Sequence, residues 1–203
     1  GRRLYVGGLE KITIWDLKAV DDLPETLAVS GGWVTTIALS ADGSRAAALS
    51  SEQEITLWDF DIPDAQPRQW VNETDPINAL ALSPDGALLA VGYQSGLLHI
   101  LNFQDLSPTG PLVGPRDQIT ALAFHPDGRI LASGGADGAI WLWDAESLST
   151  DGAPLLGHSN WVSDLAFQPA GDLLLSTGLD GLLILWDLPT RQMLGGPLHG
   201  HNG

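Results

Sequence analysis

Residues 157–187 read GHSNWVSDLAFQPAGDLLLSTGLDGLLILWD. Three short apolar runs, rich in Leu, Ile and Val, alternate here with turn residues such as Pro169, Gly171 and the pair Asp180-Gly181. Apolar runs of this length, bounded by Gly, Pro or Asp, favour short buried strands over helices. We therefore predict three strands of an antiparallel meander in this stretch.

The stretch recurs along the chain at a nearly fixed period. Its closing pair has counterparts spaced by 43, 43, 42 and 43 residues, at Trp15-Asp16, Trp58-Asp59, Leu101-Asn102, Trp143-Asp144 and Trp186-Asp187. A second marker in the first apolar run keeps the same period, at Ala38, Ala81, Ala123 and Ala166. Two independent markers that agree indicate a structural repeat.

A unit that opens with Gly157-His158 and closes with Trp186-Asp187 at this period resembles the repeats of the WD-repeat β-propeller family. The resemblance covers nearly all of the chain. It implies an all-β fold, a β-propeller built from four-stranded antiparallel blades. On this reading residues 1–203 form a single propeller domain with one partial and four complete blades, at residues 1–30 (partial), 31–73, 74–115, 116–158 and 159–203.

The resemblance also implies a ring that this stretch of chain leaves open. The chain begins in the middle of a blade and stops at Gly200-His201, where another innermost strand should start. Because the family commonly closes with about seven blades, we expect about two further repeats from the same polypeptide or a partner. Closure with five blades is the alternative, if only the missing strand is added.

Composition excludes several classes of function. Hydrophobic residues make up 44% and charged residues 17% of the chain, as in globular proteins, and no apolar run approaches the ~20 residues of a membrane span. The absence of cysteine excludes disulfides, thiol catalysis and zinc-thiolate sites. A net charge of −16 argues against nucleic acid and anionic membranes as partners.

A hydrogen-bonded chain of side chains is implied by the family resemblance. It joins a His of the Gly-His turn, a Ser or Thr of the second strand, an Asp of the next turn and the Trp of the third strand. In the last repeat these are His158, Ser176, Asp180 and Trp186; the repeat before it keeps Ser133, Asp137 and Trp143 but has Pro115 at the His position. We interpret them as internal structural braces and not as a catalytic triad, because catalysis needs an exposed nucleophile beside an oxyanion site.

No metal or cofactor site is expected. Single Asp-Gly pairs lack the dense alternation of oxygen ligands that a calcium loop requires. His199 and His201 lie two residues apart but have no evident third ligand, and zinc sites normally use three or four protein ligands.

A candidate interaction face is suggested by Trp33 and Trp161, which occupy equivalent positions at the start of innermost strands. In the family this position often lies at the rim of one face, where an exposed Trp would serve as a binding anchor. The alternative is that each Trp caps a gap between blades. The complete candidate interaction face comprises Trp33, Trp161, Asn160, Asp75, Arg116 and Tyr93.

The expected function is non-catalytic, because no stretch assembles a nucleophile, a base and oxyanion donors. We expect a protein-interaction scaffold, or a ligand-sensing or autoinhibitory module of a larger cytoplasmic protein, with a protein as its partner. Residues 188–201 are also similar to linkers in bacterial WD-repeat arrays fused to signalling ATPases of the STAND type, to kinases or to proteases. The alternative is a propeller enzyme or small-molecule-binding propeller with a site in its central channel, although the inner strands carry mainly Ala, Leu, Ile and Phe.

Overall fold

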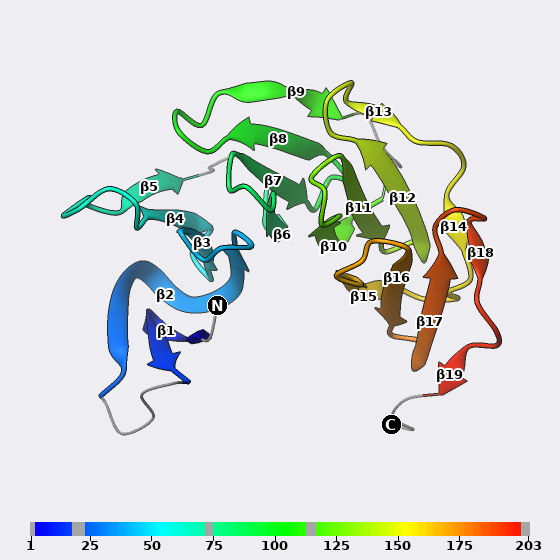
Figure 1. Cartoon of the computed structure of the whole chain (residues 1–203), viewed down its shortest axis with the longest axis horizontal. Coiled ribbons are helices and arrows are strands. Elements are labelled where there is room, and N and C mark those ends of the chain that lie inside the picture. The colour runs from blue at the N-terminus through cyan, green and yellow to red at the C-terminus, as the bar shows by residue number, and fades with distance from the viewer. Residues whose placement is uncertain (1–2, 18–22, 72–74, 113–116, 200–203) are drawn as a thin grey trace.

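The computed structural model describes residues 3–17, 23–71, 75–112 and 117–199. Within these ranges every regular element is a β-strand, and no helix long and apolar enough to cross a membrane is present. The antiparallel sheets stand side by side in an open arc, with β1 and β19 on opposite sides of the opening (Figure 1). The predicted all-β fold of four-stranded antiparallel blades is confirmed.

The strands are grouped into four hydrogen-bonded sheets. The first contains β1 to β5, at Arg3–Asp16, Glu25–Leu39, Arg45–Ser50, Glu54–Asp59 and Arg68–Val71. The second contains β6 to β9, at Ile77–Leu82, Leu88–Tyr93, Leu98–Asn102 and Pro108–Leu112. The third contains β10 to β14, at Ile119–Phe124, Ile130–Gly135, Ala139–Asp144, Ser149–Thr150 and Leu155–Leu156, the last two both paired with β12. The fourth contains β15 to β19, at Val162–Phe167, Leu173–Gly178, Leu182–Asp187, Gln192–Met193 and Leu198–His199, the last two both paired with β17.

Strand β2 connects the first two repeats without a break. Its first half pairs with β1, with Leu27 opposite Ile12, and its second half pairs with β3, with Ile37 opposite Ala48. The strand bends at Gly31, where φ is 82° and an added Cβ would lie 2.5 Å from the Ser50 hydroxyl. Only glycine fits this position. The boundary predicted between residues 30 and 31 therefore falls inside a continuous strand that bends from one blade into the next.

The hydrophobic core is divided among the interfaces between neighbouring blades. At one interface, Ala90 and Ile100 of the second sheet share a buried cluster with Leu131 and Trp143 of the third. Three further clusters occupy the other interfaces in the same way. Each blade thus buries its faces only against its neighbours, which is the energetic pattern of a repeat protein.

Glycines and polar side chains set the spacing at these interfaces. A Cβ added to Gly92 would lie 2.5 Å from Ile119, and one added to Gly134 would lie 2.5 Å from Val162, so both interfaces exclude a side chain here. At the second of these interfaces Thr120 donates a hydrogen bond of 2.6 Å to the carbonyl of Val162. Close backbone approach and a bond across the gap hold neighbouring innermost strands together.

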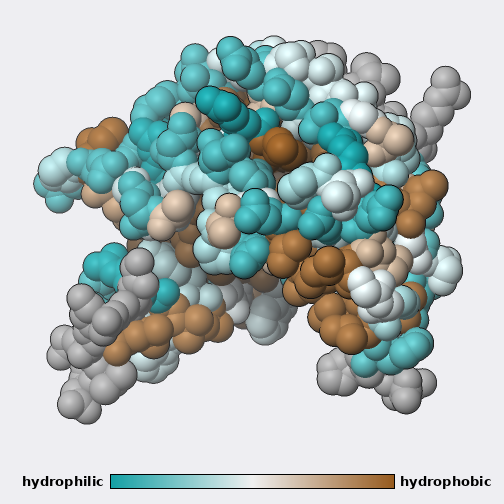
Figure 2. All heavy atoms as spheres, turned by 45° about the vertical axis from the view of Figure 1, so that its right-hand side comes forward, coloured by the Kyte–Doolittle hydropathy of each residue, from teal (hydrophilic) through white to brown (hydrophobic). Residues whose placement is uncertain are grey.

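The two outermost sheet faces of the arc are apolar and uncovered. Trp15 is 42% exposed, whereas its counterparts Trp58, Trp143 and Trp186 are buried beneath a neighbouring blade. On the other side of the opening, a shallow apolar pocket is lined by Ala166, Phe167, Gln168, Leu173, Leu175 and Leu185. Figure 2 shows hydrophobic side chains gathered at the lower right, where the last sheet comes forward.

These uncovered faces predict that residues 1–203 alone associate in solution, because exposed apolar sheet is stabilised by burial against another copy. Size-exclusion chromatography and calorimetry should show concentration-dependent multimers. Leu185→Lys should shift the chain toward monomer without unfolding it. The matched change Leu142→Lys, at the buried counterpart in the blade before, should unfold it. A stable wild-type monomer with one sharp cooperative transition would contradict the prediction.

Candidate functional site

One end of the sheets, which we call the loop face, is formed by the starts of the innermost strands and the turns beside them. At each start, a backbone carbonyl accepts a hydrogen bond of 2.7–2.9 Å from the turn that follows the second strand of the same blade. The four accepting residues are Trp33, Pro76, Gln118 and Trp161. The shared bond makes these four positions structurally equivalent.

Trp33 and Trp161 are exposed on the loop face, with 61% and 42% of the residue surface accessible. Their backbones are fixed locally, because Trp33 N donates to Ser51 Oγ at 3.1 Å and Trp161 N donates to Asn160 Oδ1 at 2.8 Å. The second and third sheets lie between the two tryptophans, so the structure places them on the same face but does not bring them together. The face therefore presents two separate aromatic positions on a rigid backbone.

The other residues predicted for this face have different surroundings. Asp75 is half-buried and accepts hydrogen bonds from the backbone and the hydroxyl of Ser95. Tyr93 is buried and packs edge-to-face on His99, with ring centroids 5.2 Å apart. Burial, assisted by the charge of Asp75, raises the pKa of Tyr93 to about 12. This corrects the placement of Tyr93 in the interaction face, because an enclosed side chain offers a partner almost no surface. Arg116 lies outside the described residues.

The brace in the last blade is complete. Trp186 Nε1 donates to Ser176 Oγ at 2.9 Å, and Ser176 Oγ lies 2.8 Å from His158 Nε2. His158 Nδ1 lies 3.1 Å from both carboxylate oxygens of Asp180. With the proton of a neutral imidazole on Nδ1, the Ser176 hydroxyl donates to Nε2, so the side chains of Trp186, Ser176, His158 and Asp180 all have partners within the brace.

Asp180 anchors the outer end of this brace. Burial disfavours its charge, but the backbone N–H groups of Ser159 and Leu182 and the His158 imidazole outweigh that effect and lower the Asp180 pKa from its ordinary value. The bond from Ser159 N also ties the start of the innermost strand to the turn at Asp180. The brace thus links all three inner strands of the blade.

The preceding blade carries a shorter version of the brace. Trp143 Nε1 donates to Ser133 Oγ at 2.8 Å, and Asp137 Oδ1 accepts from Ala139 N at 2.9 Å. The residue at the histidine position, Pro115, is outside the described part of the chain. The indole N–H of Trp143 therefore keeps its hydrogen-bond acceptor without a histidine.

The geometry of the last blade does not support catalysis. The Ser176 side chain is 1% exposed and is bonded on both sides, so no substrate reaches its hydroxyl. No group of three or more His, Cys, Asp or Glu side chains suited to a metal ion occurs among the described residues. The side chains of the brace hold the strands and turns of the blade in position.

Comparison with known families agrees with this architecture. The sequence profile of the WD40 family, described as WD domain, G-beta repeat, matches residues 67–102, 106–144 and 149–187, more than half of the chain. The chain belongs to the WD40-repeat family. WD40 repeats generally mediate protein interactions or scaffolding, and WD40 domains are typically non-catalytic. No curated protein matches the chain significantly.

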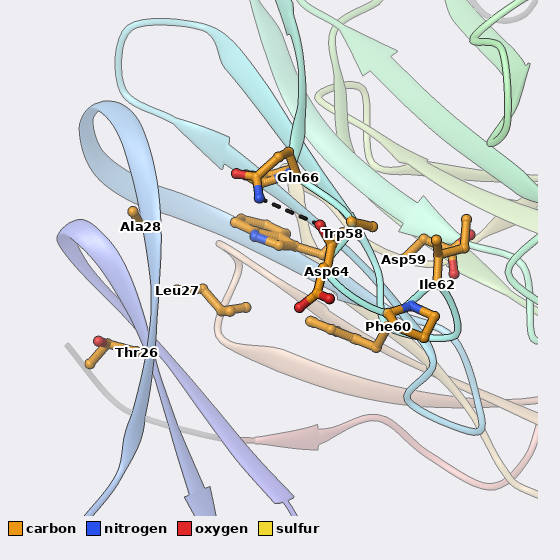
Figure 3. A pocket seen from close by; sticks show the side chains of 12 residues that line it. Thr26, Leu27, Ala28, Trp58, Asp59, Phe60, Ile62, Asp64 and Gln66 are labelled. Carbon is orange, nitrogen blue, oxygen red and sulfur yellow. Dashed lines mark hydrogen bonds between the residues drawn. The ribbon is translucent and has the colours of Figure 1, made fainter.

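A groove that was not predicted from the sequence lies between the first two blades, and Figure 3 shows it from close by. It contains Phe60 and Ile62, from the connection between β4 and β5. This connection spans residues 60–67 and is longer than its counterparts at residues 103–107 and 145–148. Two features of the sequence could have indicated the groove: the length of this connection and an aromatic residue directly after Trp58-Asp59.

The brace predicts a loss of stability on His158→Ala. The change leaves Ser176 and Asp180 without their partner in a buried site, so the free energy of unfolding should fall by about 1–3 kcal/mol. Urea denaturation measures the difference. Asn160→Ala, in the same loop, is the control and should have a much smaller effect. An unchanged midpoint, with loss of some activity instead, would mean that His158 has a functional role.

The lowered pKa of Asp180 predicts a pH-dependent part of the stability. This part is fully present above the ordinary carboxyl pKa of about 3.9 and is lost as pH falls through the lower folded value. The melting-temperature difference between wild type and Asp180→Asn should therefore shrink from about pH 6 to about pH 3. Asp172→Asn, at an exposed position in the same blade, is the control. A constant difference would contradict this assignment.

Proposed function

We propose that this WD40 chain is a non-catalytic protein-interaction module whose loop face is the binding surface. Trp33 and Trp161 are its aromatic anchors, and Asn160 and Asp75 are polar contacts beside them. The partner is a protein. A chain with net charge −16 repels nucleic acid and anionic lipid, which removes the main competing partners.

The exposure of two tryptophans at equivalent positions carries this proposal. Tryptophan buries a large area on association and is enriched among the residues that dominate binding energy. Neither Trp33 nor Trp161 belongs to any of the buried clusters between blades, which supports a role as a binding anchor over a role as a cap. Their exposure leaves their apolar surface available to a partner.

The larger context that we propose is a cytoplasmic signalling protein in which this module senses a ligand or restrains another domain. Two features support it: the similarity of residues 188–201 to linkers in bacterial WD-repeat arrays fused to STAND-type ATPases, and the absence of cysteine, which suits a reducing compartment. The uncovered sheet faces beside β1 and β17 leave room for neighbouring domains.

Trp33→Ala and Trp161→Ala should each weaken partner binding about tenfold or more while leaving the melting temperature nearly unchanged. The partner is identified by crosslinking and affinity capture with the wild-type protein and is then titrated against each variant by calorimetry. Leu156→Ala, at an exposed residue on the outer strand β14, is the matched control. Equal losses of binding and stability would show that the tryptophans belong to the core and that the loop face is not the site.

A further inference from the structure

A groove of about 490 Å³ opens between the first two blades, on the outer side of the molecule. One wall is the first half of β2, from which Leu27 points toward Trp58 and Phe60 (Figure 3). The other wall is the connection of residues 60–67, in which Gln66 Nε2 donates to the Asp64 carbonyl at 3.5 Å. The groove is apolar at its base and carries a carboxylate at its rim.

The same position in the next interface is closed by the protein itself. Phe103 is the counterpart of Phe60: each follows the last residue of the third strand, and their N–H groups donate equivalent bonds of 2.8 Å to Ser44 and Ala87. Phe103 is fully buried, because the guanidinium carbons of Arg45 and Arg68 each lie 5.1 Å from its ring centroid. Trp70 packs against the buried cluster to which Phe103 belongs.

Strand register shows why Phe60 is left open. Arg68 and Trp70 of β5 pair with Leu57 and Ile55, whereas the residues in the same register of β2 are Glu25 and Leu27. Glu25 thus places a carboxylate where Arg68 places a cation, and Leu27 places a smaller side chain where Trp70 places an indole. Phe60 consequently remains 38% exposed, and within the described ranges no cation lies over its ring.

The groove also contains an unused hydrogen-bond donor. Trp143 and Trp186 donate their indole N–H groups to serines of the second strand. The second blade has Ala48 at the corresponding place, and the described residues provide no partner for the indole N–H of Trp58. Trp58 lines the groove with an exposed fraction of 6%, and we assign its indole N–H as the donor that a peptide carbonyl would meet there.

We propose that this groove binds an extended, arginine-bearing segment of a partner protein. The arginine guanidinium occupies over Phe60 the place that Arg68 holds over Phe103, and the carboxylates of Glu25 and Asp64 balance its charge. Glu25 is on the same face of β2 as Leu27, two residues away, which directs it to the groove side. Apolar neighbours of the arginine pack on Leu27 and Ile62.

This site is separate from the loop face, although it shares with the proposed function the premise that the partner is a protein. The probe is the peptide fluorescein-Ala-Leu-Arg-Leu-Ala-amide, titrated against the protein by fluorescence anisotropy. A second peptide, with neutral citrulline in place of arginine, isolates the charge. The citrulline peptide should bind at least about tenfold more weakly.

Two groups of variants locate the binding. Phe60→Leu should weaken it about tenfold. The double variant Glu25→Arg with Leu27→Trp rebuilds the Arg68 and Trp70 arrangement, so it should abolish binding and raise the melting temperature. Three controls should bind as wild type: Glu52→Arg makes the same change in charge elsewhere, Arg3→Ala removes a cation of β1 that lines a different pocket, and Trp33→Ala disables the loop face.

Saturable binding that prefers arginine and is lost in the double variant establishes the site. The proposal is overturned if the arginine peptide does not bind saturably, if both peptides bind equally, or if the double variant binds like wild type. Because Trp33→Ala leaves the groove intact, failure of the loop face and failure of the groove are separate results.

Discussion

Burial of each sheet face by the neighbouring blade is the interaction on which the whole structure depends. No blade has a core of its own, since residues such as Ala90 and Leu131 are buried only because two blades meet there. The close approach at Gly92 and Gly134 allows this contact without voids. The same dependence explains why Trp15, with no blade beside it, is exposed while its buried counterparts are not.

Polar side chains add a second level of order within each blade. In the last blade, the brace from Trp186 to Asp180 ties together the innermost strand, the second strand and the turn before the third. A buried network of this kind stabilises only when every member is bonded. The second blade has lost the network, because Ala48 stands at the position of the brace serine, and it relies on apolar packing.

Repetition with local variation is the source of candidate binding surfaces in this chain. Phe60 and Phe103 form equivalent backbone hydrogen bonds, yet two arginines lie over the ring of Phe103 whereas Phe60 borders an open groove. Two residues of β2, Glu25 and Leu27, far from Phe60 in sequence, contribute to this difference because they stand where Arg68 and Trp70 stand in the next blade. The loop face shows the same kind of variation, because Trp33 and Trp161 occupy backbone positions that Pro76 and Gln118 occupy in the other two blades. A repeat scaffold therefore allows sites to change one position at a time without altering the fold.

The sequence by itself determined the fold class and the repeat period, because these depend on local strand patterns and on markers such as Trp143-Asp144 and Trp186-Asp187 that recur in register. The members of the brace followed from the resemblance to the WD-repeat family. Only the tertiary structure decided which side chains are accessible. Tyr93 is enclosed, Trp33 and Trp161 are exposed, and Phe60 borders a groove, and each of these outcomes depends on what the surrounding strands and the adjacent blade place against the residue. The path of β2 through Gly31 also required the structure, because a bend inside a continuous strand and a boundary between two strands have the same local sequence pattern.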